Sequence, residues 1–483
     1  MGWKGPLDRV DDYRWRIPPN YKPGMRVPGL IYADARMLET IRQDQAPEQV
    51  ANVACLPGIV GASLAMPDIH WGYGFPIGGV AAFDAEQGVV SPGGVGYDIN
   101  CGVRLLTSDL EEKDLAPRRQ QLVDELFRTI PTGVGVGGKI RLGKQEMKAV
   151  LEQGARWAVE QGYGWQEDLE RTEEGGAMAG ADASRVSDKA IKRGADQLGT
   201  LGSGNHFLEV SVVQEIYDPR VAEAFGLRKG QVVALIHSGS RGLGHQVCTD
   251  YLQVMGNATR RYGISLPDRQ LACAPVNSPE ARDYLAAMAA ASNYAWANRQ
   301  CLTHWTREVF SRVFGQPAER LGLVLLYDQA HNIAKFEEHV VEGKRRKLCV
   351  HRKGATRAFG PGRAQVPARY RAVGQPVLVP GDMGRYSYIL VGTDRAMEET
   401  FGSASHGAGR LMSRSAVKKG VSGARVRDDL AARGILVKAE SNASLAEEAP
   451  EAYKDVASVV NITHESGVAR RVARIRPVCV IKG

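Results

Sequence analysis

The stretch Gly96-Tyr-Asp-Ile-Asn-Cys-Gly-Val-Arg104 holds a carboxylate and a thiol close together in a glycine-flanked loop. Asp98 and Cys101 are three positions apart, so both side chains can reach one ion. A second glycine-rich stretch, Gly202-Ser-Gly-Asn-His-Phe-Leu-Glu-Val210, adds the imidazole of His206 in an otherwise apolar setting. Together the two stretches predict a metal site, and such a site requires both to belong to one continuous body.

Three more histidines, His237, His331 and His406, follow at loop-like positions. A carboxylate, a thiol and imidazoles suit Mn²⁺, Zn²⁺, Co²⁺ or Fe²⁺ better than Mg²⁺ or Ca²⁺, which prefer oxygen ligands. Each residue alone has an ordinary explanation, since a cysteine can be a small buried hydrophobe and an aspartate a turn former. Their shared glycine-rich or strand-end settings favour the metal centre, and Asn205 and Glu209 can support its ligands or contact a substrate.

His406 lies in the loop Gly402-Ser-Ala-Ser-His-Gly-Ala-Gly-Arg410, which suggests phosphate chemistry. Glycines can expose backbone N–H groups that bind a phosphate, and Arg410 and Arg414 follow. A neutral imidazole aimed in line with a phosphorus atom can act as a covalent nucleophile. We therefore expect His406 to meet a phosphoryl group.

The length of 483 residues would by default suggest two or three domains. However, the chain contains no linker, repeat or low-complexity tract, and the candidate ligands span Asp98 to His406. We therefore expect one catalytic domain over residues 1–483, with a charged and possibly helical insertion around 140–192. Within it, the charged stretch 172–192 reads as outside the core.

Several apolar runs predict buried strands that end next to reactive residues, namely 231–237, 321–327, 376–380 and 387–391. The run 321–327 should deliver Asp328 and His331 into a loop. Ser278 and Pro279 form a helix start, and an Ala-rich helix should continue to about Phe314. Because strands and helices do not alternate, the pattern favours an α+β fold with mixed or antiparallel sheets flanked by helices.

The composition is that of a globular enzyme, with 43% hydrophobic and 7% aromatic residues. The net charge of +8 suits a polyanionic partner such as nucleic acid, although it also suits solubility alone. The seven cysteines show no paired spacing, which favours a reducing compartment over a disulfide framework. No apolar run approaches the roughly 20 residues that span a bilayer. We expect a cytoplasmic protein that does not enter membranes.

Several motifs together closely resemble the RtcB family of RNA-splicing ligases over most of the chain. They are Met66-Pro-Asp-Ile-His-Trp-Gly-Tyr-Gly74, Pro76-Ile-Gly-Gly79, residues 91–104, residues 197–207, His237-Ser-Gly-Ser-Arg-Gly242, Ala330-His-Asn-Ile-Ala334, Pro380-Gly-Asp-Met-Gly384, Ser405-His-Gly-Ala-Gly-Arg410 and the Lys482-Gly483 end. The resemblance implies a GTP- and Mn²⁺-dependent ligase that joins RNA 3′-phosphate or 2′,3′-cyclic phosphate ends to 5′-hydroxyl ends, in tRNA splicing or RNA repair.

The resemblance also implies roles for individual residues. Two Mn²⁺ ions would be held, one by Cys101, His206 and His331 and the other by Asp98, Cys101 and His237. His406 would take GMP from GTP. The guanylate pocket would contain Asn205, Glu209, His331, Asn332, Pro380, Gly381, Met383, Ser387, His406, Gly407, Ala408, Gly409, Tyr453 and Lys482. The RNA ends would lie near Asp68, Arg193, Phe207, Arg241, Arg410 and Arg414. We expect a monomer, and an archease-type activator as a further partner.

One position departs from the family pattern. Asp382 stands where some members have a small hydroxyl residue, and an anionic side chain there would repel a triphosphate. We therefore expect a metal or ribose role for it. The other histidines considered, His304, His339, His351 and His464, match no functional position and are interpreted as structural or surface residues.

Other functions remain open from the sequence alone. A metal-dependent RNA phosphodiesterase or phosphatase would use the same ions and arginines without a nucleophilic histidine. A two-histidine phosphoesterase could use the His-x-Thr or His-x-Ser motifs at His304 and His464, but His304 falls inside the expected long helix. A lysine-nucleotidyl ligase lacks its Lys-x-Asp-Gly motif here, and a non-catalytic RNA-binding protein leaves Cys101 and the histidines without a role.

Overall fold

The computed structural model describes residues 2–412, 417 and 420–483. Its strands are β1 (Asp8–Arg9), β2 (Arg14–Ile17), β3 (Gly29–Tyr32), β4 (Ile59–His70), β5 (Ile77–Asp84), β6 (Val89–Val90), β7 (Gly102–Thr107), β8 (Phe207–Ile216), β9 (Val232–Ser238), β10 (Ala274–Pro275), β11 (Val324–Ala330), β12 (Asn332–Val341), β13 (Lys344–Lys353), β14 (Ala355–Arg357), β15 (Pro376–Val379), β16 (Ser387–Gly392), β17 (Ser403–Ser405), β18 (Leu436–Ala439) and β19 (Ala469–Lys482).

Its α-helices are α1 (Ala35–Ile41), α2 (Ala46–Val53), α3 (Glu112–Leu115), α4 (Arg119–Thr129), α5 (Lys144–Gln153), α6 (Ala155–Glu160), α7 (Gln166–Glu170), α8 (Asp188–Gly194), α9 (Pro219–Phe225), α10 (Arg241–Arg261), α11 (Pro279–Phe314), α12 (Asp394–Glu399), α14 (Gly423–Ala432), α15 (Asn442–Glu447) and α16 (Val456–Glu465). None of these described helices is long and apolar enough to cross a membrane.

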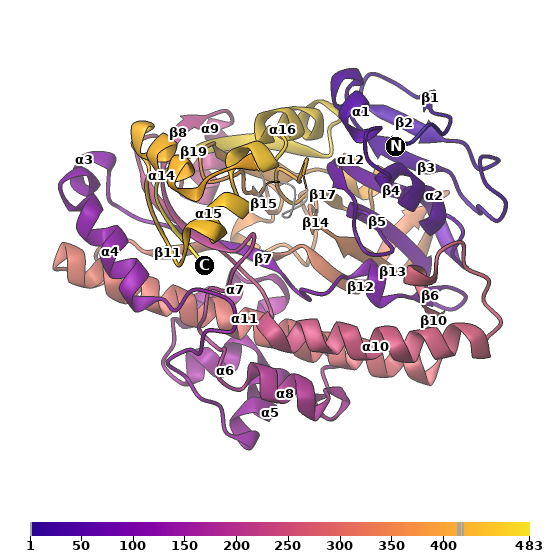
Figure 1. Ribbon diagram of the computed structural model, residues 1–483, viewed down its shortest axis with the longest axis horizontal. Helices are drawn as coiled ribbons and strands as arrows, with labels where there is room; N and C mark the ends of the chain where they lie inside the picture. Colours follow the sequence, from indigo (N-terminus) through magenta and orange to yellow (C-terminus); the bar gives the residue numbers. More distant parts are fainter. Residues whose placement is uncertain (1, 413–416, 418–419) are drawn as a thin grey trace.

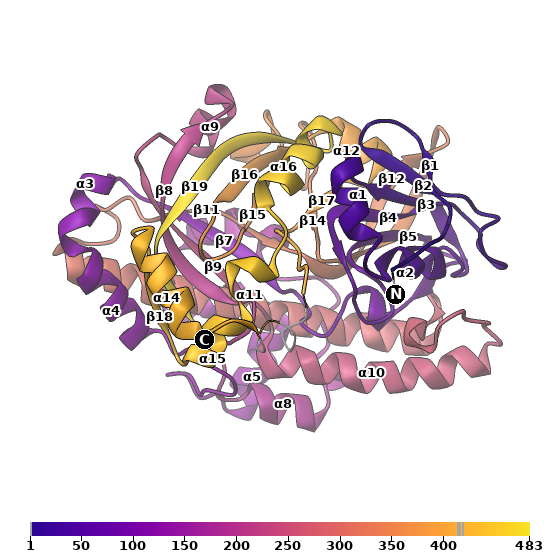
Figure 2. The same cartoon turned by 45° about the horizontal axis from the view of Figure 1, so that its top comes forward.

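Two large sheets lie side by side in the described part of the chain (Figure 1). One has the strand order β1-β2-β3-β4-β5-β13-β12, and the other β11-β7-β9-β8-β19-β16-β15 with β18 beside β19. Most neighbours are antiparallel, while β3 runs parallel to β4 and β18 to β19. The helices α10 and α11 run along one side of both sheets (Figure 2). The expected α+β architecture with mixed sheets is confirmed.

The long helix α11 forms where the sequence predicts it. The Ser278 hydroxyl accepts a hydrogen bond from the backbone N–H of Ala281, Pro279 occupies the first turn, and Gly315 ends the helix with a left-handed backbone (φ 68°). Its middle is buried and rich in alanine, so α5, α6, α10 and β9 can approach closely. The helix therefore forms the support on which the site loops rest.

The strand predictions hold for β9, β15 and β16, and one expectation about β11 is wrong. This strand runs from Val324 to Ala330, so Asp328 lies inside it instead of in a loop. Its partner β7 pairs Asp328 with Arg104. The pairing continues past the apolar run because both side chains are neutralised inside the protein.

The region 140–192 contains the helices α5, α6, α7 and α8, and its final part, 172–192, is mostly exposed or half-buried, but a few of its residues enter the core against expectation. Thr172 and Glu173 are buried. The Glu173 carboxylate accepts a hydrogen bond from the backbone N–H of Ala330 and forms an ion pair with Lys335. A charged residue that finds a cation and an amide can enter the interior, which composition alone does not show.

A buried ion cluster joins α11 to the strands β7 and β11. The Asp328 carboxylate accepts hydrogen bonds from Arg104 Nε at 2.7 Å and from the Nε and a terminal nitrogen of Arg299, both at 2.8 Å. All three side chains are fully buried. Burial alone would raise the pKa of Asp328, but the two guanidinium groups lower it, so the carboxylate stays charged.

We predict that Asp328→Ala destabilises the fold strongly, because it leaves two guanidinium groups buried without their carboxylate. The loss of unfolding free energy should be about 3–5 kcal/mol, measured by urea denaturation. As a control, Asp124→Ala removes the partner of Lys438 at the surface and should cost less than about 1 kcal/mol. Equal losses in the two variants would contradict this reading of the cluster.

Candidate active site

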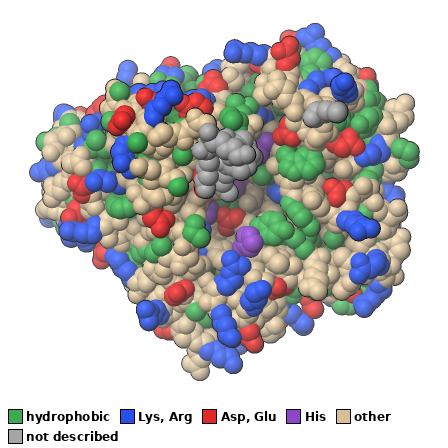
Figure 3. Space-filling model, in the orientation of Figure 1, with side chains coloured by type: hydrophobic (Ala, Val, Ile, Leu, Met, Phe, Trp, Pro, Cys, Tyr) green, Lys and Arg blue, Asp and Glu red, His purple; other side chains and the backbone are tan. Residues whose placement is uncertain are grey.

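A cavity of about 560 Å³ collects residues from both large sheets. His70 lines it from the end of β4, and His237 lines it from β9. Histidine side chains come to the surface at the hollowed centre of one face (Figure 3). The volume is within the range of small-molecule sites.

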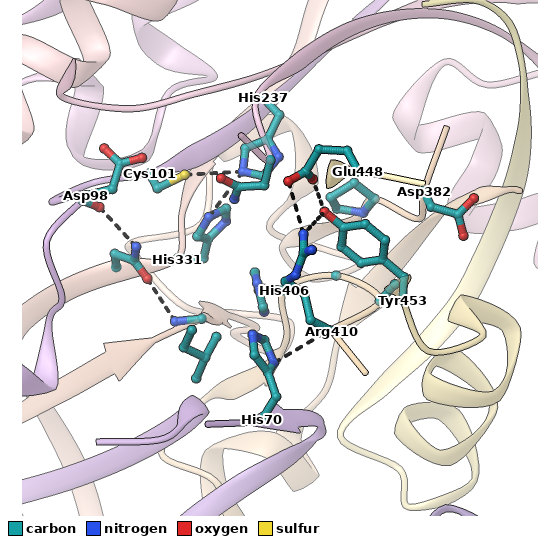
Figure 4. Close-up of a pocket in the computed structure, with 18 of the residues that line it drawn as sticks. His70, Asp98, Cys101, His237, His331, Asp382, His406, Arg410, Glu448 and Tyr453 are labelled. Atoms are coloured by element: carbon teal, nitrogen blue, oxygen red, sulfur yellow. Dashed lines mark hydrogen bonds and ion pairs between the residues drawn. The ribbon is translucent and has the colours of Figure 1, made fainter. Parts of the chain in front are cut away.

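The five predicted metal ligands lie in two adjoining groups. Asp98, Cys101, His237 and His331 line the cavity (Figure 4), and His206 lies behind them. Cys101, His237 and His331 form one group, and Asp98, Cys101 and His206 form the other. The distances from Cys101 Sγ are 3.3 Å to His206 Nε2 and 3.2 Å to His237 Nε2. His206 Nε2 lies 2.8 Å from the Asp98 carboxylate, and His237 Nε2 lies 3.4 Å from His331 Nε2.

The sequence-based division of these ligands between two ions differs from the groups that lie close together in the structure, and it stays a prediction. It joined His206 with His331, and His237 with Asp98. In the structure His331 donates a backbone hydrogen bond to the carbonyl of Cys101. His237 on β9 lies between β7 and β8, whereas His206 precedes β8 on the side of Asp98. Strand order, which residue spacing does not reveal, places His237 beside Cys101 and His331.

The protonation states fit a cation with soft and hard ligands. Burial lowers the pKa of His237 and His331 well below the usual value, so both rings are neutral and can donate a lone pair. Burial by itself would raise the pKa of Asp98. The neighbouring His206 and Arg241 outweigh burial and lower this pKa, so Asp98 is ionised. Burial and the neighbouring Asp98 raise the pKa of the Cys101 thiol, so binding of a metal there must release its proton.

The loop that carries Asp98 and Cys101 is held by a residue that the sequence analysis missed. Arg299 of α11 donates to the backbone carbonyl of Asn100 at 2.8 Å and to its side-chain oxygen at 3.0 Å. Asn100 adopts a positive φ of 50°, which is uncommon for a residue with a side chain. An arginine in the middle of an Ala-rich helix was the available signal, because such a buried charge requires partners.

His406 lies directly after β17 and is oriented by Asp68. Its Nδ1 donates to Asp68 Oδ2 at 2.7 Å, which leaves Nε2 as the free nitrogen. The rings of His406 and His331 have centroids 4.8 Å apart. Asp68 was expected near the RNA ends, but its side chain is fully buried. The contact that the structure shows is with His406, which Asp68 positions, and its place near the RNA ends stays a prediction.

The glycine-rich loop does not present its N–H groups as predicted. The backbone N–H groups of His406 and Gly407 donate to the Asp68 carboxylate, and that of Ala408 donates to the carbonyl of Pro380. Gly409 has a positive φ of 73°, and a Cβ there would lie 2.2 Å from the carbonyl oxygen of Asp68. The glycines are needed because this loop packs tightly, not because its amides are free.

Most of the predicted nucleotide contacts line the same cavity. They are Asn205, Glu209, His331, Asn332, Pro380, Gly381, Met383, His406, Gly407, Ala408, Gly409, Tyr453 and Lys482. Ser387 does not line it; its hydroxyl accepts a hydrogen bond from the backbone N–H of Gly381 and holds that loop. Burial raises the pKa of Glu209 to about 8, so its carboxyl is largely protonated at neutral pH.

Asp382 also lines the cavity, and burial raises its pKa to about 6. It belongs to neither ligand group among the described residues. One carboxylate oxygen accepts a hydrogen bond from the backbone N–H of Gly384, and Arg385 lies 3.4 Å from the other. Its visible role is to hold the turn 381–384, and the expected metal role is not supported.

The residues expected near RNA range from buried to exposed. Phe207 is buried, and the Lys482 ammonium lies 5.7 Å from its ring centroid. Arg241 donates to His206 Nδ1 at 2.9 Å. Arg193 is exposed at the end of α8, and Arg414 lies outside the described residues.

Arg410 reaches into the cavity and contacts a residue that the sequence analysis did not single out (Figure 4). It donates at 3.0 Å to the carboxylate of Glu448 and at 3.0 Å to the hydroxyl of Tyr453. Glu448 is buried and also lies 3.7 Å from the Lys482 ammonium. No motif marks this glutamate, because it follows an ordinary helix.

The remaining histidines considered lie outside the ligand groups. His304 lies in α11 and His464 in α16, so they are not on neighbouring strands as a two-histidine phosphoesterase needs. His339 is buried and paired with Glu337, and His351 is buried between aromatic rings. Their interpretation as structural or surface residues agrees with these positions.

Comparison with known proteins gives the same family throughout. The family model described as "tRNA-splicing ligase RtcB" matches residues 49–483. A tRNA-splicing ligase RtcB of Archaeoglobus fulgidus is 58% identical over 100% of both chains, and one of Thermococcus kodakarensis is 56% identical over 99% of both. An RNA-splicing ligase RtcB of Mycobacterium tuberculosis is 56% identical over 90% of this chain and all of its own length. The chain belongs to the RtcB family.

For this RtcB protein we predict that Cys101→Ser weakens metal binding, because Cys101 is common to both ligand groups. The affinity for Mn²⁺, measured by calorimetry, should fall at least about ten-fold, since even outer partners of metal ligands commonly contribute that much. With Co²⁺ the thiolate absorption band should disappear. Cys273→Ser, which changes a buried cysteine outside both groups, is the control and should bind as the wild type does. Equal losses would indicate a general effect on folding.

Proposed function

We propose that this protein is a GTP- and Mn²⁺-dependent RNA ligase that joins a 3′-phosphate or 2′,3′-cyclic phosphate end to a 5′-hydroxyl end. The main support is the position of His406, whose ring lies next to His331 of one ligand group and is hydrogen-bonded to a buried carboxylate. An oriented imidazole beside a cation site suits attack on a phosphorus atom. The family, whose printed description is an RNA ligase, supports the same reaction.

The proposed nucleophile is His406 Nε2. Because Nδ1 donates to Asp68, Nε2 carries the lone pair, and the buried carboxylate stabilises the positive charge that develops on the ring. Gly354 leaves room beside the ring, since a Cβ there would lie 3.1 Å from His406 Cε1 and clash with Ile77. These contacts fix the ring before a nucleotide arrives.

The five ligand residues would hold two divalent ions in the grouping described above, with Cys101 common to both. Such ions neutralise phosphate charge and align the leaving pyrophosphate. Lys482 and Arg410 add cationic side chains at the cavity wall. This matters because the amides of His406, Gly407 and Ala408 are already occupied by protein acceptors.

The reaction would proceed in three transfers. His406 Nε2 bonds to the α-phosphorus of GTP and pyrophosphate leaves. GMP then passes to the oxygen of an RNA 3′-phosphate, which frees His406 and gives an RNA end activated through a diphosphate. Finally a 5′-hydroxyl attacks the RNA phosphorus, loses its proton and releases GMP. A 2′,3′-cyclic phosphate is first opened by water to the 3′-phosphate.

The substrates would be tRNA halves or broken RNA, and we propose action in the cytoplasm as a monomer, with an archease-type protein as activator. The name tRNA-splicing ligase, carried by relatives from Archaeoglobus and Thermococcus, supports the tRNA substrate. The alternative is a metal-dependent RNA phosphodiesterase or phosphatase. It uses the same ions but leaves the orientation of His406 unexplained.

We predict that only His406 becomes covalently guanylylated. With α-labelled GTP and Mn²⁺, the wild type should keep the label on a denaturing gel, and the bond should be acid-labile as a phosphoramidate is. His406→Ala should lose the label but still join an RNA strand that already carries the activated end. Asp68→Asn should slow labelling roughly a hundred-fold or more, because the ring loses its orienting carboxylate.

The matched control is His304→Ala, a half-buried histidine in α11 outside the cavity lining, which should label normally. Absence of label in the wild type while RNA phosphate ends are hydrolysed would support the phosphodiesterase instead. A label that survives His406→Ala would exclude this histidine as the nucleophile.

We also predict that Lys482 contributes to the choice of GTP over ATP. Its ammonium is 2% exposed and faces the cavity at the end of β19. Guanine offers acceptors at both O6 and N7, whereas adenine carries a donor at the first position. Lys482→Ala should therefore slow labelling by GTP and narrow its advantage over ATP. The control is Lys438→Ala, which changes a half-exposed lysine on the neighbouring strand β18 outside this cavity. Unchanged GTP-over-ATP selectivity in Lys482→Ala would mean that Lys482 has only a structural role.

A further inference from the structure

The loop 70–75 at the mouth of the cavity carries aromatic side chains that the proposed reaction does not use. Trp71 is 51% exposed, although tryptophan is a residue that proteins normally bury. Trp71 and Tyr73 line the cavity, as does Tyr97 from the loop before Asp98. An exposed indole that shares a cavity wall with two tyrosine rings forms an apolar patch, and such patches commonly mark binding sites.

Side chains from distant parts of the chain hold the backbone of this loop. The N–H of Trp71 donates to the Asp44 carboxylate at 2.9 Å. The buried Gln49 side chain both donates to the carbonyl of Gly72 and accepts from its N–H. Lys353 donates to the carbonyls of Tyr73 and Phe75, and Gln270 accepts from the N–H of Gly74. The loop is thus a fixed support for its aromatic rings.

The aromatic surface continues from Tyr73 to α10. The Tyr73 and Tyr97 rings meet edge to face with centroids 5.5 Å apart. The exposed His245 stacks on Tyr97, with centroids 4.8 Å apart and planes 26° from parallel. This stack shows that the Tyr97 face accepts a flat ring, and the outer face of His245 extends it. Burial lowers the pKa of His245, and the positive charge of Arg193 lowers it further.

The setting of this surface favours a single-stranded nucleic acid over other ligands. Flat rings bind bases of any sequence, and neighbouring cations bind the backbone phosphates. Figure 3 shows hydrophobic side chains and a histidine beside the central hollow, with Lys and Arg side chains below them. The surface is continuous with the cavity in which His406 lies.

We propose that Trp71 and the Tyr97–His245 stack, joined by Tyr73, form a base-stacking platform for the unpaired nucleotides next to the RNA end that reaches His406. The inference rests on the proposed function, since it takes RNA as the substrate. It adds a binding site outside the metal and nucleotide residues. It also means that the enzyme holds an RNA end by the bases behind it, whatever their sequence.

The test measures the affinity of the full protein for a short single-stranded RNA with a 3′-phosphate, by fluorescence anisotropy without GTP. Trp71→Ala and His245→Ala should each weaken binding between about five-fold and a hundred-fold, the range for losing one stacked base. Trp71→Phe keeps a flat ring and should retain most of the affinity. Phe336→Ala removes a comparably exposed aromatic ring on β12 outside the cavity and should bind as the wild type does.

A second arm removes the bases instead of the rings. RNA with abasic nucleotides next to its end should bind the wild type at least as weakly as intact RNA binds Trp71→Ala, and Trp71→Ala should cause no further loss of affinity for that abasic RNA. Unchanged affinity in both alanine variants, as expected if the platform docks a protein, would overturn the proposal. Guanylate labelling of the wild type tests the proposed function separately, so a labelled protein with unaffected RNA binding refutes the platform alone.

Discussion

The buried pairing of Arg299 with Asp328 is the interaction on which the site geometry depends. Asp328 fixes the guanidinium through two hydrogen bonds, and the same group then reaches the backbone and side chain of Asn100. It also donates to the carbonyl of Ser238, the residue after His237. One buried charge therefore determines where two ligand-bearing segments lie relative to each other. Removing the carboxylate would leave the arginine without the partner that makes its burial tolerable.

The second constraint is the joining of the two large sheets at the cavity. Asp68 belongs to β4 of one sheet, while His237 belongs to β9 of the other. His406 bridges them, because its Nδ1 binds Asp68 and its ring lies beside His331. Neither sheet alone would place the proposed nucleophile next to the candidate metal ligands. The expectation of one continuous body, derived from ligands spread along the chain, has this physical basis.

The sequence was sufficient where local chemistry decides the structure. The cap at Ser278, the strand around His237 and the convergence of the five ligands could all be predicted, because each depends on residue type and setting. It was insufficient where long-range packing decides. The proximity of His237 to Cys101 depends on strand order, and the contacts of Asp68 and Arg299 join segments far apart in the chain. Such contacts leave no periodic or compositional trace.

The hydrogen bonds made by the loop amides around His406 limit which groups can balance the charge of a phosphate in the proposed site. A glycine-rich loop commonly binds an anion with its N–H groups, yet in this loop the N–H groups of His406 and Gly407 donate hydrogen bonds to Asp68. The buried carboxylate gains hydrogen bonds and in return fixes the imidazole. In the proposed reaction a bound phosphate would find its counter-charge in cations, namely side chains such as Lys482 and ions held by the Cys101 groups. In the proposed reaction, dependence on divalent ions would follow from orienting His406 through the loop that bears it.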